Sequence, residues 1–70
     1  MNPTYEIIAT GHNLPTLRKT ATTYERAEAL FWAMEGTLRA QGDTRDIRWL
    51  AYRGDQEEVV YDSIGSGIGD

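Results

Sequence analysis

The chain has 70 residues, no cysteine, and seven basic against eleven acidic side chains, which give a formal net charge of -4. A chain of this length forms one domain at most and buries only about 60% of the surface that its unfolded form exposes. The absence of cysteine excludes disulfides and thiolate metal sites, and it favours a cytoplasmic protein because small secreted domains normally depend on disulfides. The negative charge disfavours direct binding to nucleic acid, whose affinity for proteins comes mainly from neutralised phosphates.

No signal peptide or membrane-spanning segment is predicted. The first residues lack a basic segment followed by an apolar run, and no window approaches the 18 apolar residues of a transmembrane helix. We therefore expect no membrane association.

The first strand is predicted over residues 4–10, where polar and apolar residues alternate. Tyr5, Ile7 and Ala9 share one face of this strand. A loop rich in Gly, Asn and Pro follows, and residues 16–21 predict a weaker, polar second strand. This second strand is expected at an edge of the sheet, where Arg18 and Lys19 discourage pairing with other chains.

A helix is predicted over residues 23–41. Thr22 and Glu25 have the spacing of a capping box, in which the Thr hydroxyl and the Glu carboxylate each accept a backbone N–H of the first turn. Gly42 is a natural left-handed terminator. The apolar residues that recur at helical spacing and should face the sheet are Ala27, Leu30, Phe31, Met34 and Leu38.

The segment from Arg45 to Asp62 predicts a hairpin whose register depends on the length of its turn. A two-residue turn at Gly54-Asp55 places apolar residues opposite acidic ones. A three-residue turn, which adds Gln56, sorts the pairs by chemistry and is the preferred register. Its pairs are Trp49 with Tyr61, Ala51 with Val59, Leu50 with Val60, and Arg48 with Asp62.

This register assigns the two faces of the hairpin. The face toward the helix would carry Ile47, Trp49, Ala51, Val59 and Tyr61, and the outer face Arg48, Leu50, Tyr52, Glu58, Val60 and Asp62. The predicted fold is an α+β domain of β-β-α-β-β order over residues 1–63, in which a single helix packs on one face of an antiparallel sheet. Residues 64–70 are rich in Gly and Ser and are predicted to form a flexible tail.

No catalytic or cofactor motif is present in the sequence. His12 is the only histidine, so a nucleophile-and-base pair would depend on one loop residue. Glu57 and Glu58 are adjacent in a strand and point to opposite faces, so they cannot share a proton. Arg53-Gly54-Asp55 matches an adhesion tripeptide but is explained by turn chemistry. We therefore predict a protein that is not an enzyme and that holds neither metal nor cofactor.

Two surfaces are candidates for binding a partner. The first is a stripe on the helix formed by Glu25, Glu28, Trp32, Glu35 and Arg39, in which Glu35 and Arg39 have the spacing of a favourable ion pair. Trp32 has two interpretations, because it can fold onto the rim of the sheet or serve as a binding anchor.

The second candidate is the outer face of the sheet. It would expose an apolar patch of Ile8, Leu50, Tyr52 and Val60, framed by Glu6, Arg48, Glu58 and Asp62. Monomers seldom leave such a patch bare. A second copy of the chain, a foreign protein and the C-terminal tail are the alternatives for covering it.

The strand with Tyr5-Glu6-Ile7-Ile8, the threonine-rich second strand, the helix and the string Trp49-Leu50-Ala51-Tyr52 together resemble small phage-encoded anti-CRISPR proteins that act on type I systems. The resemblance implies a non-enzymatic protein in the host cytoplasm. Such a protein binds subunits of the RNA-guided surveillance complex and blocks pairing with target DNA. At its last turn this chain carries acidic residues where those relatives carry lysines.

These observations lead to the hypothesis of a small acidic inhibitor that covers a basic surface of a protein partner. The predicted partner-binding residues are Glu25, Glu28, Trp32, Glu35, Arg48, Leu50, Tyr52, Glu58 and Val60. The carboxylates would supply charge complementarity, and Trp32 and Tyr52 would be the anchors. The alternatives are a homodimeric structural or regulatory module that uses the outer sheet face, and a nucleic-acid binder that uses Arg18, Lys19, Arg48 and Arg53.

Overall fold

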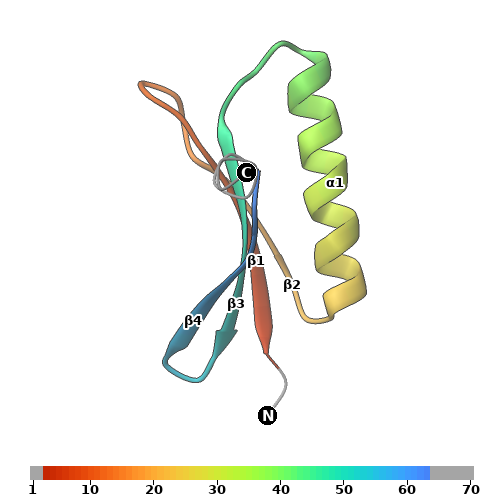
Figure 1. Cartoon of the computed structure of the whole chain (residues 1–70), viewed down its shortest axis with the longest axis vertical. Coiled ribbons are helices and arrows are strands. Elements are labelled where there is room, and N and C mark those ends of the chain that lie inside the picture. The colour runs from red at the N-terminus through yellow and green to blue at the C-terminus, as the bar shows by residue number, and fades with distance from the viewer. Residues whose placement is uncertain (1–2, 64–70) are drawn as a thin grey trace, which may run out of the picture.

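The computed structural model describes residues 3–63, and the predicted flexible tail lies outside this range. Its strands form one antiparallel sheet of order β2-β1-β3-β4, and the chain order is β-β-α-β-β (Figure 1). The predicted α+β fold is therefore confirmed. Its elements are β1 (Thr4–Thr10), β2 (Leu17–Ala21), α1 (Tyr24–Ala40), β3 (Asp46–Arg53) and β4 (Gln56–Asp62).

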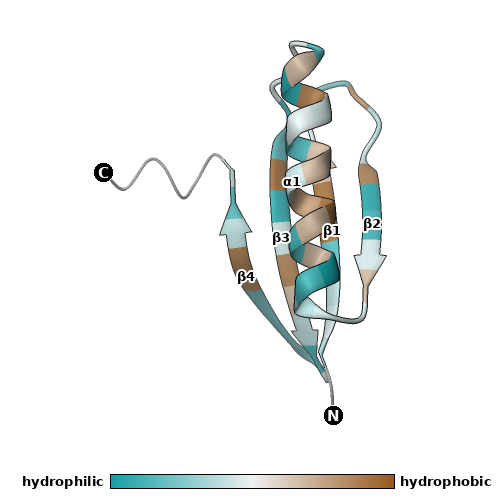
Figure 2. Cartoon of the chain, turned by 90° about the vertical axis from the view of Figure 1, so that its right-hand side faces the viewer, coloured by the Kyte–Doolittle hydropathy of each residue, from teal (hydrophilic) through white to brown (hydrophobic). Residues whose placement is uncertain are grey.

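The helix covers one face of β2, β1 and β3, whereas β4 lies beside it at the edge of the sheet (Figure 2). Alternate residues of the two central strands point toward the helix, as the period of two requires. Phe31, Ile7 and Ile47 are the largest side chains that are completely buried. The predicted helix face is confirmed for Ala27, Phe31 and Leu38, while Leu30 and Met34 are half-buried at its margin. No helix in the described part of the chain is long and apolar enough to cross a membrane.

The helix begins one residue later than predicted. Thr23, not Thr22, is the N-cap, and its hydroxyl accepts a hydrogen bond of 3.2 Å from the backbone N–H of Arg26. Since the third residue after this cap is Arg26, no capping box with Glu25 forms. At the other end Gly42 has φ 76° and its N–H bonds the carbonyl of Arg39, as predicted for a left-handed terminator.

The hairpin of β3 and β4 combines both registers that the sequence allows. Gly54 and Asp55 form a two-residue turn, with φ 64° at Gly54, and place Leu50 opposite Val59. A bulge then shifts the register, so that Trp49 faces Tyr61 and Val60 has no partner on β3. The preferred three-residue turn is therefore wrong near the turn and right beyond the bulge.

The observed register also corrects three predicted orientations, those of Glu58, Val59 and Val60. Glu58 lies opposite Ala51, a residue on the helix side of the sheet, so Glu58 does not belong to the outer face. Val60 packs against the core, whereas Val59 lies opposite Leu50 on the outer side. The turn is one residue shorter than predicted, and the bulge restores the predicted register beyond it, so the residues between turn and bulge are shifted by one position and lie on the opposite face.

Candidate protein-binding surface

A row of aromatic rings fills the space between α1 and β4. Phe31 and Trp49 are buried at its base, with ring centroids 6.0 Å apart. Tyr24 packs on Trp49 at 4.8 Å, and Tyr61 packs on Phe31 at 5.0 Å. Trp32 touches both Phe31 and Tyr61, at 5.0 and 5.6 Å. One aromatic cluster thus joins α1, β3 and β4.

Three rings of this cluster remain open to solvent. Tyr24 keeps 51% of its surface exposed, Trp32 keeps 48% and Tyr61 keeps 37%. The reason lies in the fold, because α1 covers three strands and leaves β4 beside it (Figure 2). The rings therefore shield the core on one side and face water on the other.

Of the two interpretations of Trp32, the packing on the rim of the sheet is confirmed, and the role of a binding anchor stays a prediction. The ring folds onto the rim of the sheet against Tyr61, and half of it stays available to a partner. Tyr24 was not among the predicted binding residues. Its position three residues before Ala27 and seven before Phe31 is the signal that could have identified it, since that spacing places it at the edge of the core face.

Carboxylates surround the exposed rings. Helical periodicity places Glu25, Glu28 and Glu35 on the flank of α1 that carries Tyr24 and Trp32, and Glu28 is four residues from each ring. From the sheet, Glu58 projects to the helix side. Among residues 3–63 none of these four carboxylates forms an ion pair. We call Tyr24, Trp32, Tyr61 and these four glutamates the acidic aromatic surface.

The predicted ion pair between Glu35 and Arg39 does not form. The Arg39 guanidinium instead donates to the carbonyls of Asp43 and Arg45, at 2.8 and 3.0 Å, and to the Ser63 hydroxyl at 3.3 Å. This side chain ties the end of the helix to the following loop and to the end of β4. Glu35 consequently forms no ion pair within residues 3–63.

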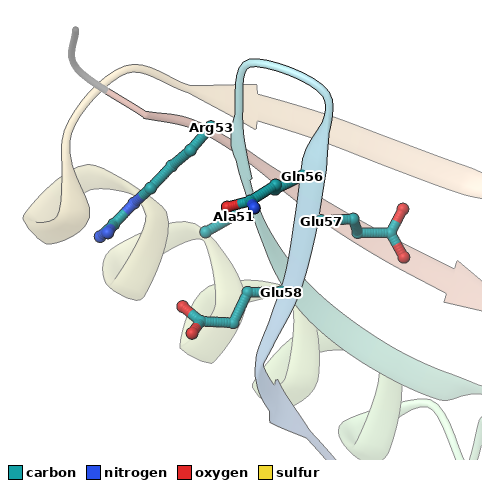
Figure 3. A pocket seen from close by; sticks show the side chains of 5 residues that line it. All are labelled: Ala51, Arg53, Gln56, Glu57 and Glu58. Carbon is teal, nitrogen blue, oxygen red and sulfur yellow. The ribbon is translucent and has the colours of Figure 1, made fainter.

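A hollow of about 410 Å³ lies near the β3–β4 turn. Ala51, Gln56, Glu57, Arg53 and Glu58 line it. Figure 3 shows Arg53 and Glu58 projecting to the same side of the hairpin, while Glu57 projects to the other. The hollow is open and polar and extends the acidic aromatic surface along the edge of the sheet.

Polar contacts cross the outer face of the sheet, on which Val59 stays 54% exposed. The Tyr52 hydroxyl donates to a Glu6 carboxylate oxygen at 3.1 Å, and Arg18 forms an ion pair with Glu6 at 3.2 Å. Burial, together with the carboxylates of Glu6 and Glu57, raises the pKa of Tyr52 to about 12. Tyr52 is therefore a neutral hydrogen-bond donor held by its neighbours.

Arg48 completes this polar cover. The predicted pair between Arg48 and Asp62 is confirmed at 3.4 Å, and Arg48 also contacts Asp46 at 3.2 Å. Leu50 lies on the same face but keeps only 5% of its surface exposed. The predicted bare apolar patch is wrong, because Val60 faces the core and Leu50 is covered.

The acidic aromatic surface offers a partner exposed aromatic rings and carboxylates. Within residues 3–63, no group of three or more His, Cys, Asp or Glu side chains could hold a metal ion. Comparisons of the chain with protein-family models, curated proteins and solved structures gave no significant match. The string Trp49-Leu50-Ala51-Tyr52 lies in β3, where the first three residues are buried. Packing alone accounts for these three residues.

Proposed function

We propose that this chain is a small, non-enzymatic inhibitor that binds a basic protein surface through its acidic aromatic surface. The observation that carries the proposal is the set of half-exposed rings on α1 and β4. Large aromatic residues that are both anchored and accessible are enriched among the residues that dominate binding energy at protein interfaces. Phe31 and Trp49 hold these rings from below, so little conformational freedom is lost when a partner covers them.

Charge supports a basic partner. The four glutamates around the rings lack ion pairs within the described chain, so their field is directed outward. Carboxylates at the rim of an interface accelerate encounter with a positive surface and fix the orientation of the complex. Positive protein surfaces commonly hold nucleic acid, and an acidic domain seated on one displaces it.

We propose a type I RNA-guided surveillance complex as the partner. The support is the β-β-α-β-β order, the resemblance described above and the sign of the charge. In this proposal the chain occupies the basic surface that receives target DNA. Its action needs no catalytic group, since occlusion alone prevents pairing.

Co-purification with purified type I surveillance complexes tests this proposal. The wild-type chain should be retained, and Glu28→Lys should lose retention, because the substitution places a positive charge between the Tyr24 and Trp32 rings. Asp55→Lys is the matched control: it makes the same change of charge at the exposed turn, away from the rings. Equal retention of the three chains contradicts the assignment of the surface, and no retention contradicts the partner.

The alternative of a homodimer through the outer sheet face has less support than the sequence indicated. That face carries the ion pairs of Arg18 and Arg48 and exposes little of Leu50. A dimer there would bury charged groups that already have partners in the monomer, which costs desolvation energy. Light scattering on a Leu50→Glu variant tests the alternative, which requires a dimer that this substitution splits.

A further inference from the structure

The two open edges of the sheet carry opposite charge. β2, at one edge, has the sequence Leu-Arg-Lys-Thr-Ala with two cations and no carboxylate. β4, at the other edge, has the sequence Gln-Glu-Glu-Val-Val-Tyr-Asp with three carboxylates and no cation. An open edge presents unpaired backbone N–H and C=O groups and is a template for another strand.

The β2 edge borders an apolar groove. All its residues except Ala21 are exposed, including Leu17, because the helix covers the strand at one end only. The groove between β2 and α1 has a volume of about 510 Å³, and Leu17, Leu30 and Met34 supply much of its apolar lining. Lys19 lies opposite Ile7 and therefore on the same helix side of the sheet. An added strand would need an apolar side chain for this groove and a carboxylate for Lys19.

The β4 edge has that composition. Glu58 lies on the helix side of the sheet, and Val60, which is half-buried against the core of its own chain, lies on the same side. Glu57 points outward, as Figure 3 shows. Both edges are thus available on one molecule, and their side chains complement one another.

We propose that copies of this chain associate head to tail, with β2 of one copy pairing with β4 of the next. In the antiparallel register that sets Lys19 opposite Glu58, Leu17 falls opposite Val60 on the same helix side. On the outer side Arg18 is then diagonal to Glu57. This register sorts the pairs on the helix side by chemistry, and on the outer side it sets Arg18 opposite Val59.

The topology permits this continuation. β4 is antiparallel to β3, β3 to β1, and β1 to β2, so β4 runs antiparallel to β2. A second copy in the same orientation extends the sheet without reversing any strand and keeps its helix on the same side. Contacts of this heterologous kind close into a ring or continue as a filament. A two-fold dimer through one edge would instead set β2 against β2, with Arg18 and Lys19 repelling their counterparts.

This inference is argued from the strand edges and not from the proposed partner, although Glu58 belongs both to the β4 edge and to the acidic aromatic surface. Its test is the mass of the purified chain by sedimentation velocity from micromolar to millimolar concentration, at low and high salt. The wild-type mass should rise beyond a dimer with concentration and fall with salt, which screens exposed charges. Glu58→Lys and Lys19→Glu should each weaken association by about tenfold.

The double variant Lys19→Glu, Glu58→Lys should restore association, because it exchanges the charges of the proposed pair. Arg26→Glu is the matched control: it makes the same change of charge as Lys19→Glu on the exposed first turn of the helix and should leave association unchanged. Circular dichroism confirms the fold of each variant. A chain that stays monomeric, that stops at a dimer, or whose double variant remains dissociated contradicts the proposal.

Discussion

Trp32→Ala separates the two roles of this tryptophan. A fully buried aromatic side chain removes roughly 200 Å² from water, and Trp32 keeps 48% of its surface exposed. Half of that area, about 100 Å² at about 25 cal/mol per Å², corresponds to about 2.5 kcal/mol. The contacts with Phe31 and Tyr61 are lost with it. We therefore expect the free energy of unfolding to fall by about 2 to 3 kcal/mol.

Urea unfolding followed by circular dichroism measures this loss. Trp32→Phe is the comparison, because a smaller ring can keep contacts on the rim of the sheet and should lose about half as much stability. A loss below about 0.5 kcal/mol for the alanine variant would mean that the ring does not rest on the sheet, and would refute the geometry of the aromatic cluster. Binding of the folded variants to the partner then reports on the exposed half of the ring.

Three further predictions concern the hairpin and two titratable groups. Deletion of Val60 removes the bulge while keeping the two-residue turn, so the fold should survive with a loss below about 1.5 kcal/mol in urea unfolding. A deletion that unfolds the chain contradicts the register. Because the pKa of Tyr52 is raised to about 12 by burial and Glu6, its contribution to stability is complete below pH 10 and is lost between pH 10 and 12. In Tyr52→Phe the free energy of unfolding should fall less steeply with pH between pH 10 and 12 than in the wild type. An unchanged slope argues against the raised pKa of Tyr52. Hydrogen bonds and charge from Arg45 lower the pKa of Asp43, so its contribution is present above pH 3.8 and is lost as pH falls through the lowered pKa. In Asp43→Asn the free energy of unfolding should fall less as the pH is lowered than in the wild type. The same fall as in the wild type would contradict the contact between Asp43 and Arg45.

Fold class and element order follow from local patterns in this chain. Alternation in Tyr5, Ile7 and Ala9, and helical spacing in Phe31 and Leu38, each mark a face that must be buried. Both patterns agree with a helix packed on one face of a sheet, so this two-layer arrangement could be predicted. The helix start could not be resolved to one residue, because Thr22 and Thr23 are both good caps.

The details of the hairpin could not be predicted from pairwise chemistry. The registers of the two-residue and the three-residue turn each give chemically matched pairs for part of the hairpin. The protein uses the first register between the turn and the extra residue Val60, and the second beyond Val60. A bulge is hard to recognise in one sequence, because the alternation of inward and outward side chains shifts by one residue at the bulge and neither pattern extends over the whole strand. The faces of Glu58, Val59 and Val60 were predicted wrongly for this reason.

The candidate site was predicted in part. The helix stripe around Trp32 is exposed and acidic, but Tyr24 and the placement of Tyr61 beside Trp32 depend on how β4 sits relative to the helix. Arg39 had a plausible partner one turn away in Glu35, and it instead bonds carbonyls that the fold brings to the helix end. Long-range contacts of this kind are decided by tertiary packing, which local spacing does not encode.

The most direct test of the proposed function is the binding of labelled target DNA to a purified type I surveillance complex as this chain is titrated. The DNA should be displaced as the chain saturates the complex, and Glu28→Lys should displace it much more weakly than Asp55→Lys. DNA binding that stays unchanged at saturating concentrations of the folded chain would contradict the proposal.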